Sequence, residues 1–306
     1  MLVILAPGQG SQKPGFMNTW LELPLYKSKL EEFSEAISLD LIKHGTLSDE
    51  ETIRDTAIAQ PLIVSASIAS SLLLDTANLS GVAGHSVGEV AAAAISGVIS
   101  NTDAMKLVNI RAQAMAKAAA SSEVTSMAAV LGGEQEVVLA RLAELGLSAA
   151  NYNGAGQIVA AGSKAGIEKL VAEGPQGSKV IPLSVAGAFH TSHMLPAVSQ
   201  LESFTSTLEI ANPEISLWSN QNGQQVTDGQ EFIQLLVGQI ANSVRWDLCM
   251  DAMVKAGVTA VIEVSPAGTL AGLAKRGMPG VEIVALKEPK DLEAAQDLLN
   301  RSTKKV

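Results

Sequence analysis

Short β-branched runs alternate with longer helical patterns along most of this 306-residue chain. Leu2 to Leu5 is the first strand candidate, Val82 and Ala83 form another, and a helix is expected from Pro61 to Leu74. Strands that alternate with helices build a parallel sheet covered by helices. Hydrophobic residues make up 47% of the chain and charged residues 17%, which excludes a disordered protein. We therefore expect an α/β protein with a large buried core.

The pattern changes between residues 124 and 184. The elements expected there are a strand, a helix, two strands, a helix and a strand: Met127 to Leu131, Glu134 to Leu145, two strands around Asn153 to Gly162, Lys164 to Glu173, and Val180 to Val185. A β-α-β-β-α-β order is typical of a ferredoxin-like lobe. We expect residues 124–184 to form a small ferredoxin-like subdomain, inserted into a large subdomain made of residues 1–123 and 185–306.

Acidic residues outnumber basic ones, with Asp plus Glu at 31, Lys plus Arg at 21 and a formal net charge of -10. That charge repels nucleic-acid phosphates and anionic membrane surfaces, so we expect no binding to nucleic acid or membrane. The apolar stretch from Val90 to Ile95 is far shorter than the roughly 20 residues that cross a bilayer. The single cysteine, Cys249, cannot form an internal disulfide, which fits a cytoplasmic protein.

Residues Gly84-His85-Ser86-Val87-Gly88 match the G-x-S-x-G pattern of a nucleophile elbow. The pattern stands between an expected strand and an expected helix from Val90 to Val98, which is where an elbow must be. Its glycines let the backbone turn sharply and present the Ser86 hydroxyl near helix N–H groups that favour negative charge. Ser86 is the candidate nucleophile, and the simpler alternative is a tight strand-to-helix turn.

A serine nucleophile needs a base, and the chain has four histidines: His44, His85, His190 and His193. His44 lies near a helix end, and His85 is beside the serine but is expected to point elsewhere. His190 follows the end of an expected strand, where α/β sheets place their ligands. His190 and His193 have no carboxylate or cysteine nearby in sequence, so we expect no metal. His190 is the candidate base.

No acid is clearly placed to complete a Ser-His-Asp triad. Asp247, Asp251 and Glu263 are possible, but each is explained as well by a charge at a helix or strand end. A backbone or amide carbonyl can orient the imidazole instead, because the second ring N–H requires an acceptor and not a carboxylate as such.

Arg111, one of six arginines, lies in a largely apolar helical stretch from Leu107 to Met115. A charge in such a helix is costly unless it is paired. A buried guanidinium beside a nucleophile is suited to grip a substrate carboxylate through two parallel hydrogen bonds. The alternative is an ordinary solvated arginine.

Two glycine-rich stretches do not predict nucleotide sites. The stretch from Gly8 to Gly15 lacks the Gly-Lys-Ser/Thr ending of a P-loop, and Gly154-Ala155-Gly156 lacks the third glycine of the dinucleotide fingerprint. No cofactor is expected. Gly8 and Gly10 make a flexible loop after the first strand, where the backbone of Gln9 can approach a ligand.

Several motifs in this order resemble the malonyl-CoA:acyl carrier protein transacylase family: Pro7 to Gln12, Gln60-Pro61, Gly84 to Glu89, Arg111, Ala188-Phe189-His190, Gly238-Gln239 and Val244-Arg245-Trp246. The resemblance spans nearly the whole chain. It implies an α/β-hydrolase-like core with parallel sheet plus an inserted ferredoxin-like small subdomain, in agreement with the element order. It also implies a monomer.

The resemblance implies a role for each matching residue. Ser86 would be the nucleophile and His190 its base, oriented by the backbone carbonyl of Gln239. The backbone N–H groups of Gln9 and Val87 would form the oxyanion hole. Arg111 would hold the free carboxylate of the malonyl group, Gln60 would line the pocket, and Asn153 would lie near it.

The implied reaction is ping-pong transfer of a malonyl group from malonyl-CoA, through a seryl ester, to the phosphopantetheine thiol of acyl carrier protein. Phe189 resembles the residue before the histidine in malonyl-selecting polyketide domains, and its bulk would crowd an α-methyl group. Ser243 departs from a proline common in the family. A polyketide enzyme, a serine thioesterase or hydrolase, and a non-catalytic acyl-binding subunit are the alternatives.

Coenzyme A and an acidic carrier protein are both anionic, so a local basic patch must attract them to a chain of this charge. Candidates lie in the C-terminal region and on the inserted lobe: Lys275, Arg276, Lys287, Lys290, Arg141, Lys164 and Lys169. The alternative is ordinary solvated surface.

Overall fold

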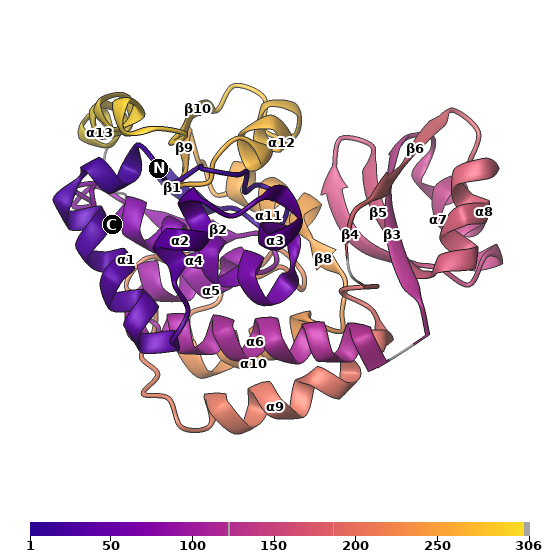
Figure 1. Ribbon diagram of the computed structural model, residues 1–306. Helices are drawn as coiled ribbons and strands as arrows, with labels where there is room; N and C mark the ends of the chain where they lie inside the picture. Colours follow the sequence, from indigo (N-terminus) through magenta and orange to yellow (C-terminus); the bar gives the residue numbers. More distant parts are fainter. Residues whose placement is uncertain (122, 186, 303–306) are drawn as a thin grey trace.

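The computed structural model describes residues 1–121, 123–185 and 187–302 (Figure 1). Within them, five strands form a parallel sheet in the order β10-β9-β1-β2-β7. Their bounds are Leu2–Ala6 for β1, Gly81–Gly84 for β2, Ser216–Trp218 for β7, Ala260–Glu263 for β9 and Glu282–Ala285 for β10. The α/β class and the parallel sheet predicted from the sequence are confirmed.

Helices cover both faces of the parallel sheet, because its central strand, β1, has apolar side chains on both faces. Leu2 and Ile4 of β1 pack into one core cluster, and Val3 and Leu5 pack into another on the opposite face. The helices of this part are α1 Pro24–Ile37, α2 Leu41–Thr46, α3 Glu50–Arg54, α4 Thr56–Ser71, α5 Gly88–Ile95, α6 Asn101–Ser121, α9 Leu195–Thr205, α10 Gly229–Gln239, α11 Trp246–Lys255, α12 Thr269–Gly277 and α13 Leu292–Arg301.

A second sheet lies at one side of the molecule, on the right in Figure 1. Its order among the described residues is β6-β3-β5-β4-β8, and the first four strands pair antiparallel. The elements are β3 Thr125–Gly132, α7 Gln135–Glu144, β4 Ser148–Gly154, β5 Gln157–Ser163, α8 Lys164–Ala172 and β6 Ser178–Leu183. This is the β-α-β-β-α-β order expected from the sequence.

The fifth strand of the second sheet comes from outside residues 124–184. It is β8, Val244–Arg245, which pairs parallel with β4 through Asn151 opposite Val244 and Tyr152 opposite Arg245. The segment that enters α11 is therefore hydrogen-bonded to the second sheet. The sequence analysis did not predict this strand.

The start of α4 differs from the expected one. The helix begins at Thr56 and not at Pro61, because the side chain of Asp55 caps it by accepting a hydrogen bond from the N–H of Ala57 at 2.8 Å. Pro61 therefore lies inside the helix. As the sixth residue of the helix, Pro61 cannot donate the i→i−4 hydrogen bond to the carbonyl of Ala57.

None of the described helices combines the length and apolar character that a membrane span requires. The basic end of the chain, from Lys304, lies outside the described residues.

Candidate active site

Ser86 stands on a sharp turn between the end of β2 and the start of α5. Its φ is +54°, in the left-handed region that residues other than glycine rarely adopt. The flanking glycines are required by close packing, since a Cβ on Gly84 would overlap Gly88, and a Cβ on Gly88 would overlap the carbonyl of Ala6. Holding a serine in this conformation stores about 1–3 kcal/mol of strain.

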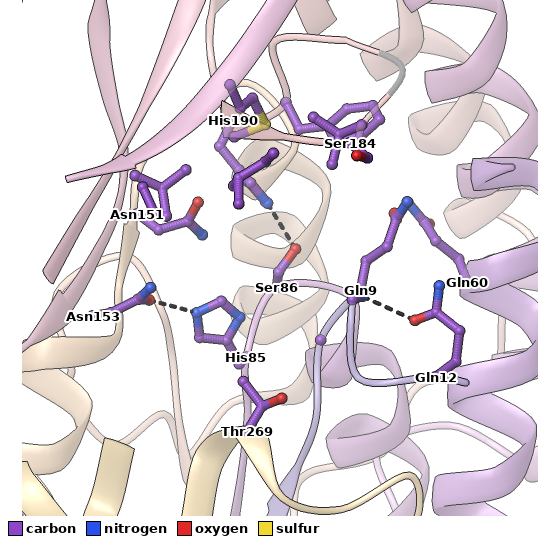
Figure 2. Close-up of a pocket in the computed structure, with 18 of the residues that line it drawn as sticks. Gln9, Gln12, Gln60, His85, Ser86, Asn151, Asn153, Ser184, His190 and Thr269 are labelled. Carbon is purple, nitrogen blue, oxygen red and sulfur yellow. Dashed lines mark hydrogen bonds between the residues drawn. The ribbon is translucent and has the colours of Figure 1, made fainter. Parts of the chain in front are cut away.

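His190 faces Ser86, with 2.7 Å between Ser86 Oγ and His190 Nε2 (Figure 2). The other ring nitrogen, Nδ1, lies 2.9 Å from the backbone carbonyl of Gln239. That carbonyl can only accept, so Nδ1 carries the proton and Nε2 is free to take the proton of the serine. His190 also has a positive φ, of +61°. The two side chains thus have the geometry expected of a nucleophile and an oriented base.

The imidazole of His190 is kept neutral by its surroundings. Burial, and then the charge of Arg111, lower the pKa of His190 to about 3. Only 5% of the residue is exposed. The neutral ring is the form that can accept a proton from Ser86.

None of the three acids considered for a triad contacts His190. Asp247 forms an ion pair with Arg245 at 2.7 Å, and Asp251 is an exposed residue of α11. Glu263 is fully buried and accepts three backbone N–H bonds at the start of α12, from Gly268, Leu270 and Ala271. A carbonyl therefore takes the place that a carboxylate holds in a Ser-His-Asp triad.

His85 lines the same cavity as Ser86, opposite His190 in Figure 2. Its Nε2 lies 2.9 Å from Asn153 Oδ1, and its ring packs edge-on against Trp246 with 5.6 Å between ring centroids. Burial lowers the pKa of His85, which favours the neutral ring. The structure thus places Asn153 beside the elbow through His85.

The loop after β1 brings Gln9 to the elbow. A Cβ on Gly8 would lie 2.8 Å from both Nδ1 and the carbonyl of His85, so only glycine allows this approach. Neither the backbone N–H of Gln9 nor that of Val87 donates a hydrogen bond within the described residues. Two backbone donors are therefore available beside Ser86.

A cavity of about 440 Å³ opens above Ser86 and is lined by the second sheet and by loops and helices of the larger part. The second sheet contributes Asn151 and Asn153 of β4; in Figure 2 the side chain of Asn151 points toward the serine and that of Asn153 toward His85. Phe189 and Gln60 line it from the larger part. The site therefore lies between the second sheet and the larger part of the molecule, and β8 of the larger part pairs with β4 directly beside Asn151.

Arg111 is fully buried and is not among the described residues that line the cavity. Its Nη1 donates to Gln60 Oε1 at 2.7 Å and its Nη2 to Gln239 Oε1 at 2.9 Å. Burial lowers the pKa of Arg111 to about 10, so it remains a cation at neutral pH. Gln60 thus stands at the cavity wall with the guanidinium bonded to it.

Sequence reasoning missed two buried residues beneath the elbow, Glu89 and Asn220. Asn220 Oδ1 accepts from the N–H of Ser86 at 2.8 Å, and its Nδ2 donates to the carbonyl of Gly84 at 2.7 Å. Glu89 accepts from the N–H of Asn220 at 2.6 Å. A charge inside an otherwise apolar helix was the available signal for Glu89, whereas nothing in the sequence marks Asn220.

The candidate basic patch is partly paired with acids. Arg141 contacts Glu144 and Glu173, while Lys164 contacts Glu168 and Lys290 contacts Glu288. Arg276 of α12 lies beside the cavity, since its Nη2 donates to Gln157 Oε1 at 3.4 Å and Gln157 lines the cavity. Across the part of the chain that the structure describes, no group of three or more His, Cys, Asp or Glu is arranged to hold a metal ion.

Comparison with known proteins gives consistent matches along the chain. Residues 3–295 match the family described as the acyl transferase domain. The malonyl CoA-acyl carrier protein transacylase of Mycobacterium tuberculosis is 46% identical over 97% of this chain and 100% of its own length. A protein of the same name from Haemophilus influenzae is 31% identical over 96% of this chain and 97% of its own length.

Solved structures of similar proteins agree with these sequence matches. A crystal structure of MCAT from Mycobacterium tuberculosis superposes with a TM-score of 0.94 at 46% identity, covering 97% of this chain and 99% of that one. A complex of a type II PKS acyl-carrier protein with its malonyl-transacylase superposes with a TM-score of 0.90 at 27% identity, with 97% and 99% covered.

Proposed function

The chain belongs to the acyl transferase family, and from this membership we propose how its active site works. The protein is a malonyltransferase that moves a malonyl group from malonyl-CoA to acyl carrier protein. This transfer supplies malonyl units for fatty-acid synthesis. The observation that carries the mechanism is the 2.7 Å contact between Ser86 Oγ and His190 Nε2, with His190 Nδ1 held by the carbonyl of Gln239.

In the first half-reaction Ser86 attacks the thioester carbonyl of malonyl-CoA while its proton passes to His190 Nε2. The oxyanion rests on the N–H groups of Gln9 and Val87, each worth about 3 kcal/mol in comparable sites. The carbon–sulfur bond then breaks, and coenzyme A leaves as the thiol with the proton from His190. A malonyl ester remains on Ser86.

In the second half-reaction His190 takes the proton of the phosphopantetheine thiol that acyl carrier protein brings. The sulfur attacks the seryl ester through the same oxyanion, and Ser86 leaves with the proton from His190. No metal or redox cofactor enters these steps, because each one moves only a proton and an acyl group.

Arg111 is the proposed partner of the malonyl carboxylate. One of its donors is bonded to Gln60, and the carboxylate would take over the position of Gln60 Oε1. Exchange of an amide oxygen for a charged one strengthens the bond to a guanidinium. Phe189, at the cavity wall, would crowd an α-methyl group and so favour malonyl over methylmalonyl.

We expect Arg111→Ala to lose the preference for malonyl-CoA over acetyl-CoA. The loss of a charged hydrogen-bonding partner should lower kcat/KM for malonyl-CoA by a factor that corresponds to about 2–3 kcal/mol of transition-state stabilisation. The kcat/KM for acetyl-CoA, which has no carboxylate, should change little. Transfer rates with the two donors, measured side by side, test this. Unchanged selectivity would contradict the carboxylate clamp.

We further propose that the parallel sheet and its helices form an α/β-hydrolase-like large subdomain of residues 1–123 and 185–306, and that residues 124–184 form a ferredoxin-like small one. The strand order β6-β3-β5-β4 and the antiparallel pairing support the latter. The protein would act as a cytoplasmic monomer. Carrier protein would approach over α12, where Lys275 and Arg276 lie in the last turn beside the cavity.

A serine hydrolase would use the same Ser86 and His190, so transfer must be measured against hydrolysis. With radiolabelled malonyl-CoA and carrier protein, we expect the label on intact carrier protein. Free malonate as the main product would favour the hydrolase. Fatty-acid and polyketide carrier proteins offered together as competing acceptors would show which one the enzyme prefers.

A further inference from the structure

Glu89 is a buried carboxylate that the mechanism above leaves without a role. It is the second residue of α5 and only 1% exposed. One carboxyl oxygen accepts from the N–H of Asn220 at 2.6 Å, and the other from Gln239 Nε2 at 2.5 Å. Burial raises the pKa of Glu89 to about 8, although these two donors and the charge on Arg111 oppose that rise. Both oxygens nevertheless face N–H donors, which suits the ionised form, because a protonated carboxyl would need an acceptor for its O–H.

Arg111 is the cation that faces this carboxylate, although no direct ion pair joins the two within the described residues. The side chain of Gln239 lies between them. Its Oε1 accepts from Arg111 Nη2 at 2.9 Å, and its Nε2 donates to Glu89 and, at 3.0 Å, to the carbonyl of Ser86. An amide with a cation at its oxygen and a carboxylate at its nitrogen has one favourable orientation.

We propose that Glu89 is a positioning residue for acyl transfer, which acts through the side-chain amide of Gln239 to hold Arg111 where it meets the malonyl carboxylate. The inference rests on the proposed function, in which Arg111 grips that carboxylate. With Nη2 fixed by Gln239, Nη1 remains directed at Gln60, the residue that lines the cavity. The guanidinium is thereby aimed before substrate arrives, which is the condition for rapid and selective binding.

Glu89→Gln separates this role from that of a mere counter-charge, because the two roles predict opposite results. If Glu89 only balanced charge, its loss would leave Arg111 more attractive to a carboxylate, and malonyl selectivity would rise. If Glu89 positions Gln239, selectivity falls. The oxygen of the new amide serves the N–H of Asn220, so its NH2 group meets Gln239 Nε2. Because two donors cannot pair, the side-chain amide of Gln239 rotates by about 180°, and Arg111 Nη2 then faces the NH2 group of Gln239.

The experiment measures kcat/KM of Glu89→Gln with malonyl-CoA and with acetyl-CoA, using acyl carrier protein as acceptor. We expect the malonyl-to-acetyl ratio to fall on the order of tenfold to a hundredfold, the loss that accompanies one hydrogen bond to a charged group. A ratio equal to or above that of the wild type would overturn the proposal.

We call the path from Glu89 through the side chain of Gln239 to Arg111 the relay. Gln239→Leu removes the middle of this relay and provides a second test if Glu89→Gln folds poorly. Any residue at 239 keeps the backbone carbonyl that orients His190, so this variant removes only the side chain. The ratio should fall in the same way, and the double variant should lose no more than the worse single one. Losses that multiply in the double variant would mean that Glu89 does not act through Gln239.

Glu263→Gln is the matched control, because Glu263 is equally buried but accepts its hydrogen bonds at α12. We expect a lower melting temperature with a wild-type malonyl-to-acetyl ratio. An equal loss of selectivity here would contradict the relay. Arg111→Ala, measured in parallel, separates the proposed role of Arg111 from that of Glu89. A wild-type malonyl-to-acetyl ratio in Arg111→Ala would reject binding of the carboxylate by Arg111. A lower ratio in Arg111→Ala with a wild-type ratio in Glu89→Gln would reject only the relay.

Discussion

Ser86→Ala is expected to abolish the covalent malonyl adduct and to lower transfer on the order of 10⁶-fold, the loss seen when a serine nucleophile is removed. The reason is geometric, because Ser86 Oγ is the hydroxyl that lies 2.7 Å from the base. Intact-mass spectrometry after incubation with malonyl-CoA checks it, since the wild-type protein should gain one malonyl group and the variant none.

Ser184→Ala is the matched control, because Ser184 also lines the cavity and should leave adduct formation at Ser86 intact. The thiol of Cys249 is no substitute nucleophile. It is buried, it donates to the carbonyl of Ser219 at 3.3 Å, and burial raises its pKa. A malonyl adduct on Ser86→Ala would mean another nucleophile, and no adduct on the wild type would favour a non-catalytic acyl-binding protein.

His190→Ala should lower the rate of both half-reactions on the order of 10⁴-fold, the upper range for general acid–base catalysis. Without the imidazole, the hydroxyl of Ser86 has nowhere to send its proton and the leaving thiolate has no proton donor. Rapid-mix measurement of malonyl-enzyme formation, followed by discharge to carrier protein, resolves the two steps.

His193→Ala provides the comparison, because His193 lies three residues later and is not among the described residues that line the cavity. It should keep both rates. The pH profile adds a second readout, since the lowered pKa of His190 means that its ring takes up a proton only well below the ordinary value of about 6.5. The acid limb due to His190 should therefore lie below about pH 5, and a limb near 6.5 would contradict the burial argument.

Local sequence patterns predicted the parts of the site that depend on local conformation. The elbow could be read from its glycines because a sharp turn has a sequence signature, and His190 from its place after an expected strand. The second sheet followed from the order of its elements. These features depend on residues that are close in sequence.

The rest depends on contacts between residues far apart in sequence, which leave no periodic signal. Asn220 meets Ser86 across 134 positions, and the two-residue strand β8 exists only because β4 lies beside it. Arg111 was expected to be costly if buried, but the sequence could not show that two amide oxygens, not a carboxylate, would receive it. The expected helix start at Pro61 is wrong because Asp55 caps the helix five residues earlier, at Thr56.

The positive φ angles of Ser86 and His190 have a consequence for how a protein of this kind can change over generations. The chain holds these two residues in backbone conformations that residues other than glycine rarely adopt, at a cost in stability that the proposed reaction would explain. Glycine would relieve this strain at position 86, where the side chain is small, so stability alone gives no reason to keep serine there. Gains in robustness must therefore come from residues remote from the elbow.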